Sequence, residues 1–195
     1  MKPIYDIVVK PYGNRYNNTV SVGDKKLIVN TEIYNHQYVN REAIIISTPI
    51  YNPNNLQEGE RILVHHNVFR RWHNVKGVEK NSKSFLNEDE YLISQDQVYM
   101  YNRNGWICTP GYTFVKPIKS KSKYSKDIEQ PLVGVVKYSD GTYLPNQLVG
   151  FTPNSEYEFV VDSERLYRVM NKFITIEYEY KGDEEEYNPS WAQSC

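Results

Sequence analysis

The sequence contains no long hydrophobic run and only two cysteines. No stretch approaches the roughly 18 consecutive apolar residues that a membrane-spanning helix requires, and the residues after Met1 lack the apolar core of a secretory signal peptide. The cysteines, Cys108 and Cys195, are too few for a disulfide framework in a chain of 195 residues. We therefore expect a cytoplasmic protein with no membrane partner.

An excess of charge of either sign is also absent. The chain has 23 basic and 24 acidic residues, which gives a formal net charge of -1. A chain without an overall electrostatic field does not concentrate polyanions at its surface. Composition alone therefore indicates neither nucleic acid nor an anionic membrane as a partner.

Helical signals are scarce, whereas residues typical of strands and turns are common. Alanine is rare, and no window of about 12 residues has the periodicity of an amphipathic helix. The 18 tyrosines and the many asparagines favour strands joined by turns. We therefore predict an all-β fold class.

Motifs that would indicate catalysis are absent as well. The sequence has no glycine-rich phosphate loop and no G-x-S-x-G nucleophile motif. Cys108 has no histidine or other activating residue beside it in the sequence. We therefore expect a binding or assembly protein rather than an enzyme.

Short β-branched or aromatic runs, bounded by proline, glycine and asparagine, mark the expected strands. The first set lies at 7–11, 43–48, 61–66 and 90–101. After a turn-rich joint at 102–105, a second set lies at 112–118, 132–138, 147–153 and 165–180. The chain is thus organised as two successive groups of strands.

The two groups of strands have similar sequence patterns in the same order. Val9-Lys10-Pro11 is echoed by Val115-Lys116-Pro117, VHHNVF from Val64 by FTPNSE from Phe151, and QDQVYMY from Gln95 by MNKFITI from Met170. Similarity that keeps its order along the chain indicates an internal repeat. We predict one domain over residues 1–104, a second, divergent domain over 111–180, and an acidic and polar tail over 181–195 that frays.

The two halves differ most in their first long connection. In the first half a polar segment at about residues 13–40 surrounds one apolar cluster, Leu27-Ile28-Val29, whereas the second half needs only residues 119–131. So long a connection is uncommon in a compact domain unless it is functional, disordered or partly structured. Because asparagine, glycine and lysine dominate it, we expect residues 13–40 to form a mobile loop.

Six features of the first half follow one another in a defined order. They are an opening strand at Asp6–Lys10, the tripeptide Leu27-Ile28-Val29, a strand start at Arg41–Ile44, a Gly-acidic strand entry at Gly59–Val64, an acidic turn and strand at Glu88–Ile93, and a closing strand entered through Gln95–Gln97. This order resembles that of the GroES-like co-chaperonins, the ring-shaped lids of the cylindrical chaperonins. The resemblance covers the first half well and the second half in outline.

The resemblance implies a fold of two tandem small GroES-like β-barrels that assemble into a homo-oligomeric ring, by resemblance a heptamer. Such a co-chaperonin caps a GroEL-type chaperonin and assists the ATP-dependent folding of an enclosed client protein. Since ATP hydrolysis then belongs to the chaperonin, the chain itself needs no cofactor. The residues that would bind the chaperonin are Leu27, Ile28 and Val29.

Three departures from the family pattern bear on this interpretation. Lys25-Lys26 replaces the small residues that usually precede the tripeptide, residues 48–59 lack an obvious roof hairpin, and the connection from His65 to Asn87 is enlarged. The pattern is similar to divergent viral co-chaperonins, which implies a bacteriophage protein acting in the host cytoplasm on a client such as a capsid protein. The alternative is a virion structural or assembly protein that keeps the barrels without binding a chaperonin. For Leu27-Ile28-Val29 itself, the alternative interpretation is an ordinary strand packed on the barrel.

Histidines are the one group that could indicate a metal site. His65 and His66 are adjacent, with His73 and His36 elsewhere in the first half. Adjacent side chains on a strand point to opposite faces, and no cysteine or carboxylate stands at a recognised ligand spacing. We therefore expect no metal site.

The segment at residues 69–84 mixes basic residues with Phe69 and Trp72. Such a mixture can bind single-stranded nucleic acid on small barrels. We favour instead a solvated long hairpin, or a contact between subunits with an acidic neighbouring surface. Nucleic acid is therefore not an expected partner.

Overall fold

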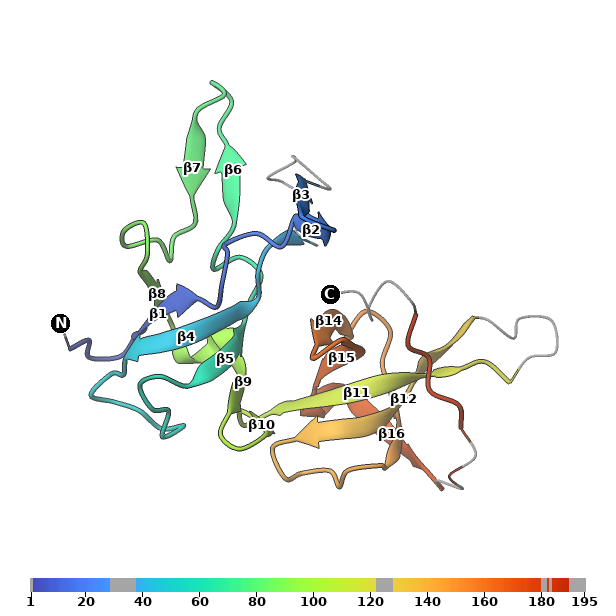
Figure 1. Ribbon diagram of the computed structural model, residues 1–195. Helices are drawn as coiled ribbons and strands as arrows, with labels where there is room; N and C mark the ends of the chain where they lie inside the picture. The colour runs from blue at the N-terminus through green and yellow to red at the C-terminus, as the bar shows by residue number, and fades with distance from the viewer. Residues whose placement is uncertain (1, 29–37, 122–127, 180–181, 183, 190–195) are drawn as a thin grey trace. The chain divides into compact units, whose positions relative to one another are not determined.

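The computed structural model describes residues 2–28, 38–121, 128–179, 182 and 184–189 (Figure 1). The chain divides into two compact units, Met1–Gly105 and Trp106–Cys195. The main sheets are antiparallel, which confirms the predicted all-β class. No helical segment of the described chain has the length and apolarity that a membrane span needs.

The first unit is built on five strands that pair in the order β9-β5-β4-β1-β8. They are β1 (Ile7–Pro11), β4 (Glu42–Ser47), β5 (Arg61–Val64), β8 (Tyr91–Ile93) and β9 (Val98–Asn102), with the 3-10 helix η2 (Gln95–Gln97) before β9. Apolar side chains from all five strands fill the core, including Val9, Ile45 and Tyr91, which are almost completely buried. This sheet is the support from which the more exposed parts of the unit project.

Two small hairpins extend from this main sheet, and neither lies within the strand ranges that the sequence analysis gave. They consist of β2 (Thr19–Val22) with β3 (Lys25–Ile28), and β6 (Arg71–His73) with β7 (Glu79–Asn81). Figure 1 shows the β6–β7 hairpin projecting away from the sheet of its unit. The solvated long hairpin favoured for residues 69–84 is therefore present.

The second unit contains a sheet in the order β14-β15-β11-β12-β13-β16. Its strands are β11 (Tyr112–Lys119), β12 (Glu129–Ser139), β13 (Leu148–Phe151), β14 (Tyr157–Val161), β15 (Glu164–Met170) and β16 (Ile174–Tyr178), with the 3-10 helix η3 (Asn171–Phe173) before β16. Strand β10 (Trp106–Cys108) begins the unit, in the gap that the sequence analysis left between the two predicted domains. Val115, Val136 and Val149 lie at the centre of this unit's core.

The two units share one strand topology. In the first unit β1 pairs with β4 and β8, β4 pairs with β5, and β5 pairs with β9. In the second unit β11 pairs with β12 and β15, β12 pairs with β13, and β13 pairs with β16, which is the same order if β14 is left aside. Each unit also has a 3-10 helix between its fourth and fifth strands. The predicted internal repeat is therefore confirmed at the level of strand pairing.

The registers of the two units match residue by residue. Pro11 pairs with Ala43, and Pro117 pairs with Gly134, each two residues after a shift in register. Val64 and Phe151 occupy equivalent positions, as the sequence comparison proposed. The proposed match between QDQVYMY and MNKFITI is offset by one residue, because Val98 corresponds to Ile174 in the strand pairing. Among the described residues no strand pairing closes either sheet into a barrel.

The described segment 184–189 of the acidic tail contacts β11. Lys119 N donates to Glu185 O at 2.8 Å and Tyr187 N donates to Pro117 O at 2.9 Å. Lys116 and Lys119 add ion pairs to Glu186 and Glu185 at 2.7 and 2.8 Å, and the hydrogen bond from Lys119 lowers the pKa of Glu185. The expected fraying is wrong for this segment because β15 pairs with β11 only as far as Val115, which leaves the rest of that edge open to the tail.

Candidate interaction hairpin

The long connection at residues 13–40 has a fixed base. Asn17 N donates to Tyr38 O at 2.7 Å and Asn40 N donates to Arg15 O at 3.1 Å, so the two ends of the connection run side by side. Tyr16 and Val39 form a bridge between these ends, and both are buried in the core of the first unit. The two ends of the connection are therefore paired with each other where they leave the main sheet, rather than forming an open loop.

Asn40 holds this base together with its side chain. Its Nδ2 donates to Tyr12 O at 2.8 Å and to Asn14 O at 2.7 Å, while its Oδ1 accepts from Glu42 N at 2.9 Å. The residue is only 2% exposed, so water does not readily replace these partners. A buried amide that satisfies three backbone groups fixes the path of the chain where the connection leaves the sheet.

Replacing Asn40 by alanine is expected to destabilise the first unit by about 1–3 kcal/mol, because two carbonyls and one N–H lose their partner. Thermal unfolding measures the loss, and hydrogen exchange at the backbone amides of Asn17 and of position 40 should accelerate. Asn14→Ala is the matched control, since the exposed Asn14 contributes only its backbone carbonyl to this network. An unfolding temperature that is the same for both variants would contradict the assigned role of Asn40.

Arg15 ties the same base to the segment that leads into β6. Its Nε donates to Phe69 O at 2.7 Å and its Nη2 donates to Arg70 O at 3.3 Å. The guanidinium lies 5.4 Å from the centre of the Tyr91 ring, and burial lowers the pKa of Arg15. Asn40, through its side-chain amide, and Arg15, through its guanidinium, thus fix the base of the connection to the first unit.

Beyond this base the chain forms the β2–β3 hairpin. Gly23 stands first in its two-residue turn with φ 60°, as in type II′ hairpin turns, where a side chain would be strained. Every residue of β3 is exposed, including Leu27 at 52% and Ile28 at 64%. These two residues therefore do not form the packed strand that was the alternative interpretation of the tripeptide.

The register of the hairpin distributes its apolar side chains over two faces. Leu27 and Ile28 are consecutive on a strand, so they point to opposite sides. Val22 pairs with Lys25 and so shares a face with Leu27, and it is 59% exposed. Val22 was missed by the sequence analysis, although the alternating segment TVSV followed by Gly-Asp could have revealed the hairpin.

The third residue of the predicted site, Val29, lies outside the described residues, as does His36. The structure therefore places two of the three predicted chaperonin-binding residues, Leu27 and Ile28, next to each other on one exposed strand. The predicted mobility of residues 13–40 stays a prediction. Because a two-stranded hairpin is only marginally stable by itself, we expect weak protection at its tip.

The structure also describes His65, His66 and Cys108, which the sequence analysis considered. No three histidine, cysteine or acidic side chains gather into a possible metal site among the described residues. His65 and His66 stack at 4.3 Å instead of facing opposite ways, because β5 ends at Val64 and they lie beyond it. Cys108 is buried, and burial raises the pKa of its thiol, which disfavours the nucleophilic thiolate.

Comparison with known proteins adds no family to this description. No family model matches the chain, and no curated protein matches it. The functional argument therefore depends on the geometry of the hairpins and on the order of features along the chain.

Proposed function

We propose that this protein is a co-chaperonin that forms a ring in the cytoplasm, caps a GroEL-type chaperonin and encloses a folding client. The single observation that supports it best is the β2–β3 hairpin, which presents Leu27 and Ile28 to solvent above a buried, hydrogen-bonded base. The order of sequence features along the first unit agrees with this role. The protein itself catalyses no reaction in this proposal.

Exposed apolar side chains on a projecting hairpin suit reversible binding to an apolar groove. Full burial of one such side chain contributes roughly 1.5–3 kcal/mol, whereas ordering a flexible segment on binding costs on the order of 2–5 kcal/mol. A single hairpin therefore binds weakly. Several hairpins on one ring bind together, because each bound hairpin raises the effective concentration of the others.

The first connection of the second unit differs in sequence from that of the first unit. Between β11 and β12 the sequence is short, rich in lysine and serine, and without an apolar triplet. In the proposal the first unit makes the contact with the chaperonin. The second unit then extends the lid.

Co-purification tests the proposal. A GroEL-type chaperonin, incubated with the tagged chain, should retain it in the presence of nucleotide and release it when nucleotide is removed. Absence of retention in both conditions would contradict the co-chaperonin role. If the chain then still assembles and is retained in virus particles, the alternative of a virion structural or assembly protein is supported instead.

A further inference from the structure

The β6–β7 hairpin ends in a preorganised tip that no described part of its own unit covers. Asn74 Oδ1 accepts from Lys76 N and from Val78 N, both at 3.0 Å, and Asn74 N donates to Val78 O. This network fixes the turn, yet the side chain of Val75 is fully exposed and that of Val78 is 51% exposed. A turn that is already ordered loses little conformational entropy when it binds a partner.

The hairpin is strongly basic. Residues 70–83 contain five lysines or arginines and one acidic residue, Glu79, which pairs with Arg71 at 3.1 Å. Lys76 at the tip and Lys80 on β7 form no ion pair within the described chain. The tip therefore presents apolar valines beside two free cations.

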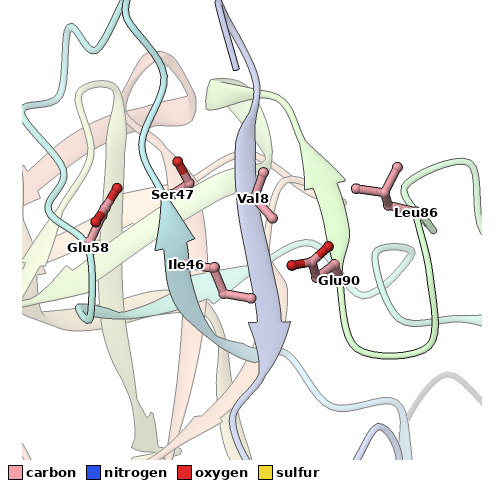
Figure 2. A pocket seen from close by; sticks show the side chains of 6 residues that line it. All are labelled: Val8, Ile46, Ser47, Glu58, Leu86 and Glu90. Atoms are coloured by element: carbon pink, nitrogen blue, oxygen red, sulfur yellow. The ribbon is translucent and has the colours of Figure 1, made fainter. Parts of the chain in front are cut away.

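A pocket of complementary character lies on the main sheet of the same unit. It has a volume of about 290 Å³. Figure 2 shows its apolar floor, formed by Val8 of β1 and Ile46 of β4, with the carboxylates of Glu58 and Glu90 on either side. Leu86, which is 40% exposed, supplies an apolar wall.

The carboxylates of this pocket also lack cationic partners. Glu90 accepts a hydrogen bond from Asn87 Nδ2 at 2.7 Å, and neither Glu90 nor Glu58 forms an ion pair within the described chain. The turn before β8 adds Glu88 and Asp89 to the negative charge near this rim. An apolar floor with an acidic rim suits a ligand that carries an apolar group next to a cation.

We propose that the tip of the β6–β7 hairpin of one copy docks into the pocket of Val8, Ile46, Leu86, Glu58 and Glu90 of a second copy of this chain. Val75 meets the apolar floor, and Lys76 and Lys80 pair with the two glutamates. The contact forms between copies because the hairpin projects away from the sheet that carries the pocket (Figure 1).

Such a contact joins two different surfaces of identical chains. A head-to-tail interface of this kind produces a ring when its rotation closes and a filament when it does not. The inference thus deepens the proposed function, because it identifies the contact that would join neighbouring subunits of the ring. It does not require that a chaperonin be present.

Charge reversal at both surfaces tests the contact on the full-length chain by sedimentation velocity at low ionic strength. The wild type should sediment as an oligomer of the 23.0-kDa chain. Glu58→Lys/Glu90→Lys and Lys76→Glu/Lys80→Glu should each lose the oligomer and sediment as a single chain. The chain with all four substitutions should regain it, because its opposite charges face each other again.

Lys2→Glu/Lys172→Glu is the matched control for the lysine variant, since it lowers the net charge of the chain by the same amount at two exposed lysines outside both surfaces. It should leave the oligomer intact, and 0.5 M salt should weaken the wild-type oligomer through screening. A wild type that is a single chain at every concentration, or a fourfold variant that does not regain the oligomer, would overturn the contact. A chain whose oligomer survives the charge reversals and is retained by a chaperonin would overturn this contact and still support the proposed function, so the two failures are distinguishable.

Discussion

Leu27→Ser/Ile28→Ser is expected to weaken the retention of the chain by a chaperonin by at least about 100-fold. Each substitution removes an apolar side chain whose full burial contributes roughly 1.5–3 kcal/mol, and about 1.4 kcal/mol corresponds to a tenfold change in affinity. The effect is larger on an oligomeric ring, because every hairpin is altered at once. Nucleotide-dependent co-purification or a binding isotherm measures it.

The same double variant should keep the unfolding temperature of the wild type. Leu27 and Ile28 are more than half exposed, so serine at these positions removes little buried area and changes stability by about 0.5 kcal/mol or less. Ile128→Ser/Leu144→Ser is the matched control, because these residues of the second unit are 59% and 68% exposed. The control should bind the chaperonin as the wild type does.

Two outcomes would count against the role of the β2–β3 hairpin. A drop of several degrees in the unfolding temperature would mean that Leu27 and Ile28 pack against the unit after all. Unchanged retention with an unchanged unfolding temperature would place the chaperonin contact elsewhere on the chain. The second result would direct attention to Val22 and Val29, the remaining apolar residues named beside this site.

The main strands of both units could be predicted because their signal is strong and local. The segment 7–11 matches β1, and 61–66 begins at the first residue of β5. Their valines and isoleucines are buried at consecutive positions, and therefore on both faces of the sheet, which produces apolar runs bounded by turn residues. The repeat was detectable for the same reason, since equivalent strands must bury similar side chains.

The elements that the sequence analysis missed are short and mostly exposed. No residue of β3, β6 or β7 is buried, so these strands carry no core pattern and are defined by pairing alone. Strand β10 has only three residues between the turn residues Gly105 and Thr109. Strand β14 pairs along its whole length with β15, and its run YEFVV was, like TVSV at 19–22, a signal left unused.

The candidate site was only partly predictable from the sequence. The resemblance indicated Leu27 and Ile28, but the residues that position the hairpin, Asn40 and Arg15, act through long-range contacts. Asn40 Nδ2 reaches Tyr12 O across 28 residues, and Arg15 Nε reaches Phe69 O across 54. A polar side chain that serves distant backbone atoms leaves no local pattern, because its partners are set by the fold.

Gly134→Ala is expected to destabilise the second unit by about 2–4 kcal/mol, a large effect for a single methyl group. A Cβ at Gly134 would lie 2.7 Å from the carbonyl oxygen of Lys116 and 3.0 Å from Cγ2 of Val115. Both atoms belong to the paired strand β11, so the sheet must shift to admit the methyl group. For a unit of this size the expected fall in unfolding temperature is roughly 10 °C or more.

The internal repeat supplies the control for this prediction. Ala43 occupies the equivalent position in the first unit, opposite Pro11 as Gly134 is opposite Pro117, and it is completely buried. Ala43→Gly removes a buried methyl group and adds backbone freedom, so it should cost about 1–2 kcal/mol in the first unit alone. Hydrogen exchange followed by mass spectrometry assigns each loss to its unit, with faster exchange at β11–β13 for Gly134→Ala and at β1–β5 for Ala43→Gly. If Gly134→Ala unfolds at the wild-type temperature, β11 and β12 are farther apart than this geometry requires, and the residue-by-residue equivalence of the two units fails at this position.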